Sequence, residues 1–224
     1  MQESGAARLP ERIELVMLDC DGVLFESCEA NVAYYDAILS RLDRPPLNEL
    51  QRELAHRLST GQLFEHVFEG DAALLERSLS VACEIGYAPF FEQMTPMPGL
   101  FEVLDTLRRS WRTAMVTNRS ATIVPLLERF GLAPHFDAVV GLCDVTRPKP
   151  APDMVELCLA RLGVEPARAV YVGDSPTDGM AARAAGVRFI GLGAAVAGEE
   201  HWIAGLDALP TFLVERLSGG VKSG

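Results

Sequence analysis

The chain has 224 residues, of which 49% are hydrophobic and 23% charged, so it can bury a sizeable core and is neither low-complexity nor disordered. Its 20 lysines and arginines against 31 aspartates and glutamates give a net charge of −11, which repels polyanions and argues against a nucleic-acid partner. No run approaches the roughly 18 apolar residues of a membrane span, and the five cysteines form no CxxC pair. Because the polar start also lacks a signal core, we expect a cytoplasmic protein with no membrane partner.

Five short runs rich in valine and isoleucine predict the strands of a parallel sheet. They lie at 13–19, 113–118, 137–141, 168–174 and 187–192. Their apolar residues are consecutive, as in strands that helices cover on both faces. Helical patterns at 98–109, 121–130, 152–162 and 176–186 alternate with the later runs, and Ser120 is the expected N-cap of the second. The order predicts an α/β fold with a Rossmann-like, five-stranded parallel sheet.

The stretch 25–94 carries leucine, phenylalanine and alanine at helical spacing and no convincing strand. Helices are expected at 28–42, 47–58, 63–69 and 72–86, separated by Pro45-Pro46, Gly61 and Gly70-Asp71. An insertion after the first strand lies over the carboxyl ends of the parallel strands, where open α/β sheets bind ligands. We therefore predict a core domain at 13–24 and 95–218, a helical cap domain at 25–94, and frayed ends over the first dozen residues and from 218 onward.

Two acidic motifs each follow an apolar strand. Asp19 and Asp21 precede Gly22 after the first strand, and Asp174 and Asp178 follow the fourth strand run. Carboxylates that converge at one sheet edge repel each other unless a cation lies between them, and oxygen-only ligands favour magnesium. Taken singly, each motif also fits a simple turn or a helix cap. Together they predict a metal site.

Three further residues predict an anion site at the same edge. Thr117 and Asn118 end the second strand before a helix, where a hydroxyl and free backbone N–H groups can hold an anion, although helix capping is the simpler alternative. Lys149 is one of only two lysines, and the prolines on either side of it restrict the backbone and so fix where the amine points. An incidental surface charge is the alternative for Lys149.

The ordered set Asp19-x-Asp21-Gly22, Thr117-Asn118, Lys149 and Gly173-Asp174-x-x-x-Asp178 resembles the motifs of the haloacid dehalogenase superfamily over about residues 13–213. The phosphoglycolate phosphatase-like branch is the most similar in DCDGVLFES, VTNRS, RPKPAPD and VGDSPTDGMAARAAG. The resemblance implies a magnesium-dependent phosphoric monoester hydrolase, with Mg²⁺ as cofactor and a small phosphorylated metabolite as substrate. We expect a monomer or a homodimer.

The resemblance also implies how the reaction is divided among the residues. Asp19 would attack phosphorus and form an aspartyl-phosphate that water hydrolyses. Asp21 would protonate the leaving alkoxide and then deprotonate that water. The implied binding roles are magnesium on Asp19, Asp21 (through its main-chain carbonyl), Asp174 and Asp178, and the phosphoryl group on Thr117, Asn118 and Lys149.

Other reactions of the family fit less well. Asp21 argues against halide displacement, which needs no proton donor there, and phosphonate cleavage in the family uses a cap lysine, a residue type that is missing from 25–94. A sugar-phosphate mutase of the β-phosphoglucomutase type remains open. A non-catalytic binding module is a further alternative, but such a module would be expected to have lost at least one of Asp19, Asp21, Lys149 or Asp174.

Substrate choice would lie with the cap, opposite the core motifs. The turn that begins at Arg57 is near the place where the family presents its specificity loop, and Arg57 is a candidate partner for a substrate carboxylate. Gln62 and His66 are candidate partners for a substrate hydroxyl, and for all three a solvated or cap-internal role is the alternative. Arg119 departs from the family pattern, because a lysine is common after the asparagine.

Overall fold

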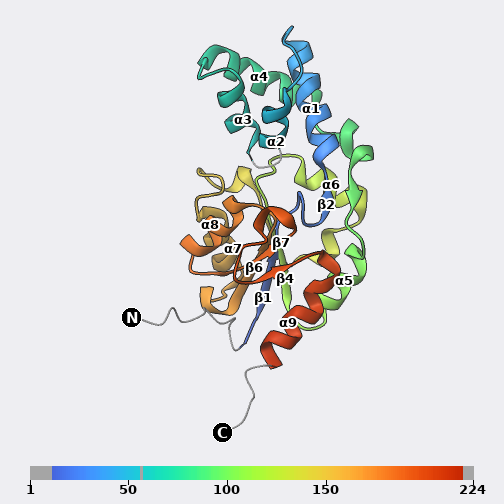
Figure 1. The fold of residues 1–224 in the computed structure, drawn as a ribbon, viewed down its shortest axis with the longest axis vertical. Helices are drawn as coiled ribbons and strands as arrows, with labels where there is room; N and C mark the ends of the chain where they lie inside the picture. Colours follow the sequence, from blue (N-terminus) through green and yellow to red (C-terminus); the bar gives the residue numbers. More distant parts are fainter. Residues whose placement is uncertain (1–11, 56–57, 219–224) are drawn as a thin grey trace.

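The computed structural model describes residues 12–55 and 58–218, and within these ranges six strands form one parallel sheet in the order β5-β4-β1-β6-β7-β8 (Figure 1). Every neighbouring pair in this sheet runs parallel. The strands are β1 (Leu15–Leu18), β4 (Arg112–Val116), β5 (Ala138–Val140), β6 (Ala169–Gly173), β7 (Arg188–Leu192) and β8 (Trp202–Ile203).

Helices cover both faces of the sheet, as the consecutive apolar residues predict. In β1, Leu15 and Met17 belong to one buried cluster, and Val16 and Leu18 belong to the other. Figure 1 shows α5 and α9 on one side of the sheet and α7 and α8 on the other. The helices beside the sheet are α5 (Leu100–Arg108), α6 (Ile123–Phe130), α7 (Asp153–Leu162), α8 (Pro176–Ala184) and α9 (Leu209–Ser218).

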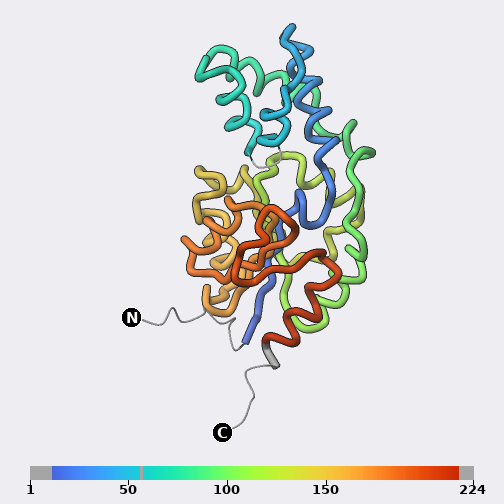
Figure 2. Tube along the Cα trace, in the orientation of Figure 1, coloured from blue at the N-terminus to red at the C-terminus, as the bar shows by residue number. Residues whose placement is uncertain are grey.

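A helical insertion follows β1 and lies at one end of the sheet, as Figures 1 and 2 show. It contains α1 (Cys28–Arg41), α2 (Glu49–Leu54), α3 (Thr60–Val67), α4 (Ala72–Ile85) and the 3₁₀ helix η1 (Ala88–Gln93). Asn48 and Ser59 start α2 and α3 with capping boxes, and Asp71 caps α4 by accepting from two backbone N–H groups.

The two chain segments that join the insertion to the sheet pair with each other. The short strands β2 (Phe25–Glu26) and β3 (Thr95–Pro96) form an antiparallel ribbon, with Phe25 opposite Pro96. The chain therefore leaves the core and returns to it side by side (Figure 2). The exact division into a core at 13–24 and 95–218 and a cap at 25–94 stays a prediction.

Several local expectations differ from the structure. The sheet has a sixth strand, β8, whose two residues are too few to show a sequence pattern, and β2 lies inside the stretch expected to lack strands. Ser120 does not cap α6, because that helix begins later with Thr122 at its N-cap. Helix α3 includes Gly61, since the capping box of Ser59 and Gln62 starts the helix before the glycine. Helix α2 ends at Leu54, earlier than expected.

Five further 3₁₀ turns connect the elements of the described core, at η2 (Ala133–His135), η3 (Leu142–Asp144), η4 (Pro166–Arg168), η5 (Ala194–Val196) and η6 (Leu206–Ala208). Among the helices of residues 12–55 and 58–218, none combines the length and the hydropathy that a membrane crossing needs. The expected frayed ends at 1–11 and 219–224 lie outside the described residues.

Candidate active site

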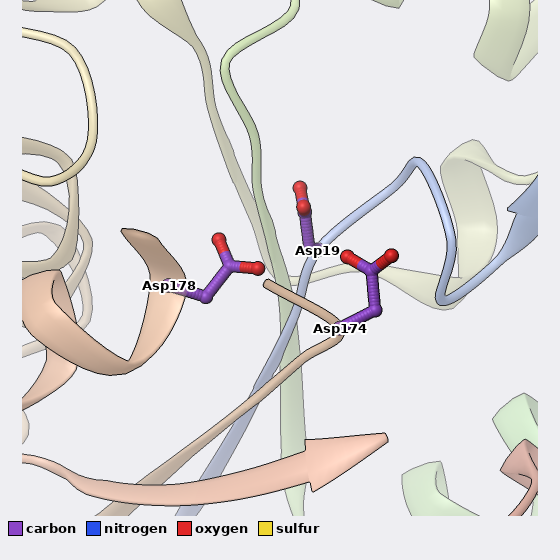
Figure 3. Close-up of side chains that lie close together, drawn as sticks. All are labelled: Asp19, Asp174 and Asp178. Atoms are coloured by element: carbon purple, nitrogen blue, oxygen red, sulfur yellow. The ribbon is translucent and has the colours of Figure 1, made fainter. Parts of the chain in front are cut away.

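Three carboxylates meet where two neighbouring strands end. Asp19 follows β1, Asp174 follows β6, and Asp178 lies in the first turn of α8. Each offers an oxygen within 4.8 Å of the others'. Figure 3 shows the three side chains gathered around one region from these elements. The fold therefore brings the two acidic motifs together because β1 and β6 pair in parallel and end at the same edge.

Two glycines make room for this acidic cluster. A Cβ on Gly22 would lie 1.9 Å from Oδ2 of Asp174, and the backbone of Gly22 has a φ of +75° that side-chain-bearing residues rarely adopt. A Cβ on Gly173 would lie 2.5 Å from the Cβ of Asp178. Glycine is thus needed at both places for the acidic side chains to approach the turn.

Lys149 places a positive charge inside the cluster. Its side chain is 3% exposed, and its Nζ lies 3.0 Å from Oδ1 of Asp19 and 2.6 Å from Oδ1 of Asp178. The ammonium also donates to the hydroxyl of Tyr171, which in turn donates to the carbonyl of Val116. Burial would lower the pKa of Lys149, but Asp178 and Asp19 outweigh burial and raise it, so the amine stays charged.

Asp178 acts as an orienting group for its neighbours. Its carboxylate accepts from the backbone N–H and the hydroxyl of Ser175, which caps α8, and from Nζ of Lys149. The side chain is fully buried. Its oxygens are thus committed to donors within the protein, so Asp178 fixes Lys149 and borders the cation site.

The acidic cluster has the donors and the charge imbalance of a divalent-cation site. Burial, followed by the charges of neighbouring aspartates, raises the pKa of Asp174 to about 8. Burial likewise raises the pKa of Asp19 to about 7, although Lys149 opposes the rise. Carboxylates whose charged forms are this unfavourable gain from a cation, and an all-oxygen donor set suits Mg²⁺.

The carboxylate of Asp21 lies apart from this cluster and faces a different cation. Arg119 donates to both of its oxygens, at 2.8 Å from Nε and 2.6 Å from a terminal nitrogen, and the Ser27 hydroxyl donates at 2.5 Å. Burial would raise the pKa of Asp21, but the charge and hydrogen bonds of Arg119 outweigh it and lower the pKa. The structure thus pairs the side chain of Asp21 with Arg119, and a cation shared by the side chains of Asp19 and Asp21 stays a prediction. A role for the main-chain carbonyl of Asp21 stays a prediction.

Thr117 and Asn118 lie at the end of β4 beside the cluster. The Thr117 hydroxyl accepts from the backbone N–H of Arg119, which leaves its own proton available for an anion. The side chain of Asn118 accepts from the backbone N–H of Lys149 and donates to its carbonyl. Asn118 therefore holds the backbone of Lys149, and a direct contact with phosphate stays a prediction.

A cavity of about 540 Å³ lies between the acidic cluster and the insertion. Asp19, Asp21, Lys149 and the end of β4 form one wall, and aromatic and aliphatic side chains such as Tyr35 and Leu75 form the other. Gln62 lines the cavity, but its side-chain oxygen accepts from Ser59 in the cap of α3.

Of the other two specificity candidates, only His66 belongs to the described residues. His66 is exposed on α3 and does not line the cavity, and Arg57 lies outside the described residues.

Sequence reasoning missed two residues that organise the site. Tyr171 lies within the expected strand at 168–174, and a tyrosine hydroxyl inside an apolar strand that ends at an aspartate signals a buried polar partner; here the partners are Lys149 and the carbonyl of Val116. Arg119 stands out in the sequence only as a departure from the family pattern, whereas in the structure it holds Asp21. An arginine that follows a strand end within an otherwise acidic site is the signal that could have identified it.

The comparisons with known proteins agree with this geometry. Residues 16–192 match the family model described as haloacid dehalogenase-like hydrolase. The chain is 31% identical over 223 residues to phosphoglycolate phosphatase 1 of Pseudomonas aeruginosa, covering 95% of this chain and 79% of that one. It is 29% identical over 211 residues to pyrophosphatase PpaX of Bacillus velezensis, covering 93% and 94%.

A solved structure is similar over nearly its whole length. A HAD-superfamily hydrolase of subfamily IA, variant 1, from Geobacter sulfurreducens is 32% identical, with a TM-score of 0.72 over 92% of this chain and 99% of that one.

Proposed function

Because the chain belongs to the haloacid dehalogenase-like hydrolases, we propose that it is a magnesium-dependent phosphatase that hydrolyses a small phosphorylated metabolite through an aspartyl-phosphate on Asp19. One observation carries the proposal furthest. The buried carboxylate of Asp19 lines the 540 Å³ cavity, lies in the acidic cluster, and contacts the ammonium of Lys149 at 3.0 Å. The proposed nucleophile and a fixed cation thus lie on one wall of the cavity, beside the acidic cluster that would hold the metal.

The chain's own residues divide the proposed reaction between two carboxylates. Asp19 is oriented by Lys149 and by the backbone N–H of Cys20, which donates to its Oδ1 at 2.7 Å, and attacks phosphorus. Asp21 lines the same cavity. Against the effect of burial, Arg119 lowers its pKa in the free protein, so Asp21 takes up a proton as the negatively charged substrate binds beside it. It then delivers that proton to the leaving oxygen and afterwards takes one from the attacking water. Lys149 offsets the charge shared by Asp19 and the phosphoryl oxygens, and the Thr117 hydroxyl donates to one of them.

Asp19 and Asp174 would hold the magnesium ion together with the main-chain carbonyl of Asp21, and Asp178 would lie at its border. Once bound, Mg²⁺ would supply the positive charge that offsets the carboxylates and the phosphoryl oxygens. Two fully charged carboxylates and a phosphate monoester would otherwise repel each other in this buried place.

The proposed substrate is a phosphate monoester of phosphoglycolate-like size. Relatives named phosphoglycolate phosphatase support this class, and a relative named pyrophosphatase makes pyrophosphate the natural comparison substrate. The cavity wall contributed by the insertion decides between them, because the core wall binds only the phosphoryl group that all of these compounds share.

A phosphate-release screen of purified protein tests the proposal. We expect inorganic phosphate from p-nitrophenyl phosphate only with magnesium, and the highest kcat/KM with a small phosphate monoester such as phosphoglycolate. Undiminished release in excess chelator would contradict the metal requirement. Transfer of the phosphoryl group between positions of a sugar phosphate, without net phosphate release, would instead identify a mutase, and no turnover at all would indicate a binding module.

A further inference from the structure

A closed ring of hydrogen bonds surrounds the carboxylate of Asp21; we call it the Asp21 ring. Arg119 donates to Asp21 and, at 3.3 Å, to the hydroxyl of Tyr87. Tyr87 donates at 2.5 Å to the amide oxygen of Asn31, whose nitrogen lies 3.4 Å from the hydroxyl of Ser27. Ser27 donates back to Asp21 and closes the ring.

The residues of the Asp21 ring are buried, and Tyr87 holds the guanidinium of Arg119 in place. Ser27, Asn31, Tyr87 and Arg119 are all 8% exposed or less. The guanidinium of Arg119 lies 4.5 Å from the centre of the Tyr87 ring, a distance at which the aromatic face attracts a cation. A bidentate arginine fixes both the position and the plane of a carboxylate, so the plane of Asp21 depends on where Tyr87 holds Arg119.

Members of the Asp21 ring come from distant parts of the chain. Asp21 and Arg119 follow β1 and β4 in the core, whereas Ser27 and Asn31 lie at the start of α1 and Tyr87 lies between α4 and η1. The ring therefore joins the core motifs to both ends of the insertion. No other part of the proposed reaction uses Asn31 or Tyr87. Their buried hydrogen bonds are therefore explained only by what they do to Arg119 and Asp21.

We propose that Arg119, Tyr87 and Asn31 are positioning residues that set the orientation of the Asp21 carboxylate toward the leaving oxygen. This inference rests on the proposed function, in which Asp21 protonates the leaving group. Arg119 acts directly on Asp21, and the insertion acts on Arg119 through Tyr87. The hydrogen bond between Tyr87 and Asn31 fixes the tyrosine in turn.

Leaving-group chemistry separates this role from a merely structural one. A benzyl alkoxide is a strong base that needs a proton as it departs, whereas p-nitrophenolate departs without one. The parameter kcat/KM covers the steps up to loss of the leaving group and does not include the later hydrolysis of the phosphoenzyme. A misplaced proton donor should therefore lower kcat/KM for benzyl phosphate and spare that for p-nitrophenyl phosphate.

The experiment compares both substrates, with magnesium, in full-length variants. Tyr87→Phe keeps the aromatic face over Arg119 but removes two hydrogen bonds of the ring, and we expect kcat/KM for benzyl phosphate to fall about tenfold with less than a twofold change for p-nitrophenyl phosphate. Asn31→Ala should act in the same direction. Arg119→Gln should have the larger selective effect, and Arg119→Lys should restore part of it because the charge is kept.

The matched control is Tyr34→Phe, which removes a buried hydroxyl from the same aromatic group. That hydroxyl donates to the carbonyl of Ala82 rather than to a member of the Asp21 ring, and Tyr34→Phe keeps the aromatic packing of this residue on Tyr87, whose ring centre lies 5.1 Å away. We expect this variant to leave the ratio of the two kcat/KM values as in the wild type. Thermal melting of each variant confirms that it is folded, and Tyr87→Phe keeps the test decisive if Asn31→Ala does not fold.

Asp21→Asn distinguishes failure of the inference from failure of the proposed function. We expect this variant to lose about a hundredfold in kcat/KM for benzyl phosphate, selectively. If Asp21→Asn is selective but Tyr87→Phe and Arg119→Gln lower both substrates equally, the positioning role is wrong and the proposed function stands. If Asp21→Asn is itself unselective, the acid role of Asp21 is wrong, and the inference falls with it.

Discussion

The ammonium of Lys149 lies 2.6 Å from the carboxylate of Asp178, and both side chains are almost completely removed from solvent. The same ammonium reaches Asp19 at 3.0 Å. Lys149 thus links the group that orients it to the group proposed to attack phosphorus. Removing one charge from such a buried pair leaves the others uncompensated, which costs more than the loss of an exposed pair.

Lys149→Met should therefore affect both activity and stability. We expect turnover to be abolished and the free energy of unfolding, measured by urea denaturation near pH 8 without metal, to fall by about 3 kcal/mol. The control is Arg147→Met, at a position two residues before Lys149 in the sequence. It removes an exposed arginine from its ion pair with Asp153. The control should unfold close to the wild-type midpoint. Equal destabilisation by both substitutions would contradict a special role for the buried charge.

Magnesium affinity should rise with pH. Burial raises the pKa of Asp19 to about 7 and that of Asp174 to about 8, so both carboxyls carry protons at pH 6 that the metal must displace. The apparent dissociation constant, measured by calorimetry, should fall between pH 6 and pH 9 and level off above. A pH-independent constant over this range would contradict the prediction. In Asp174→Asn the remaining pH dependence should be weaker, because one competing proton is gone.

Stability of the metal-free protein should change in the opposite direction. A carboxyl whose pKa is higher in the folded than in the unfolded state stabilises the fold while it is protonated, and that stabilisation is lost as the pH rises through the folded-state pKa. Asp19 and Asp174 both have raised pKa values, so we expect their contribution to the free energy of unfolding to decline from pH 5 to pH 9. Added magnesium should raise the melting temperature most at the upper end of this range.

Gly22→Ala should weaken the metal site through a steric contact. The added methyl group would lie 1.9 Å from Oδ2 of Asp174 and displace that carboxylate. Gly70→Ala is the matched control, because Gly70 also has a positive φ, +83°, but nothing lies within 4 Å of its would-be Cβ. Both variants carry the strain of a left-handed backbone, about 1–2 kcal/mol. Only Gly22→Ala should lose the increase in melting temperature that magnesium produces. An equal response to magnesium in both would refute the steric account.

Much of the fold could be predicted from the sequence because apolar runs and helix boundaries are local signals. The five longer strands follow from consecutive valines and isoleucines, and α7 begins and ends where Pro152 and Gly163 predict. Two-residue strands such as β8 are set by tertiary pairing, so no local pattern marks them. The start of α3 depended on a reciprocal contact between Ser59 and Gln62 that competes with the helix-breaking tendency of Gly61.

The site was predictable to the extent that residues lie at strand ends. Because β1 and β6 pair in parallel, they end at the same edge of the sheet, and this brings Asp19 and Asp174 together. Pairing between side chains from remote segments was not predictable. Arg119 could equally have faced an anion, and its contact with Asp21 depends on how Tyr87 and the insertion pack against the core.

The central claim is that Asp19 carries the phosphoryl group, and chemical trapping tests it most directly. Protein mixed with p-nitrophenyl phosphate and magnesium is quenched in acid within one turnover and reduced with borohydride, which converts an aspartyl-phosphate to homoserine. Peptide mass analysis should then find homoserine at position 19, dependent on substrate and magnesium and absent from Asp19→Asn, which should be folded and inactive. Homoserine at another aspartate, or undiminished turnover by Asp19→Asn, would contradict the account.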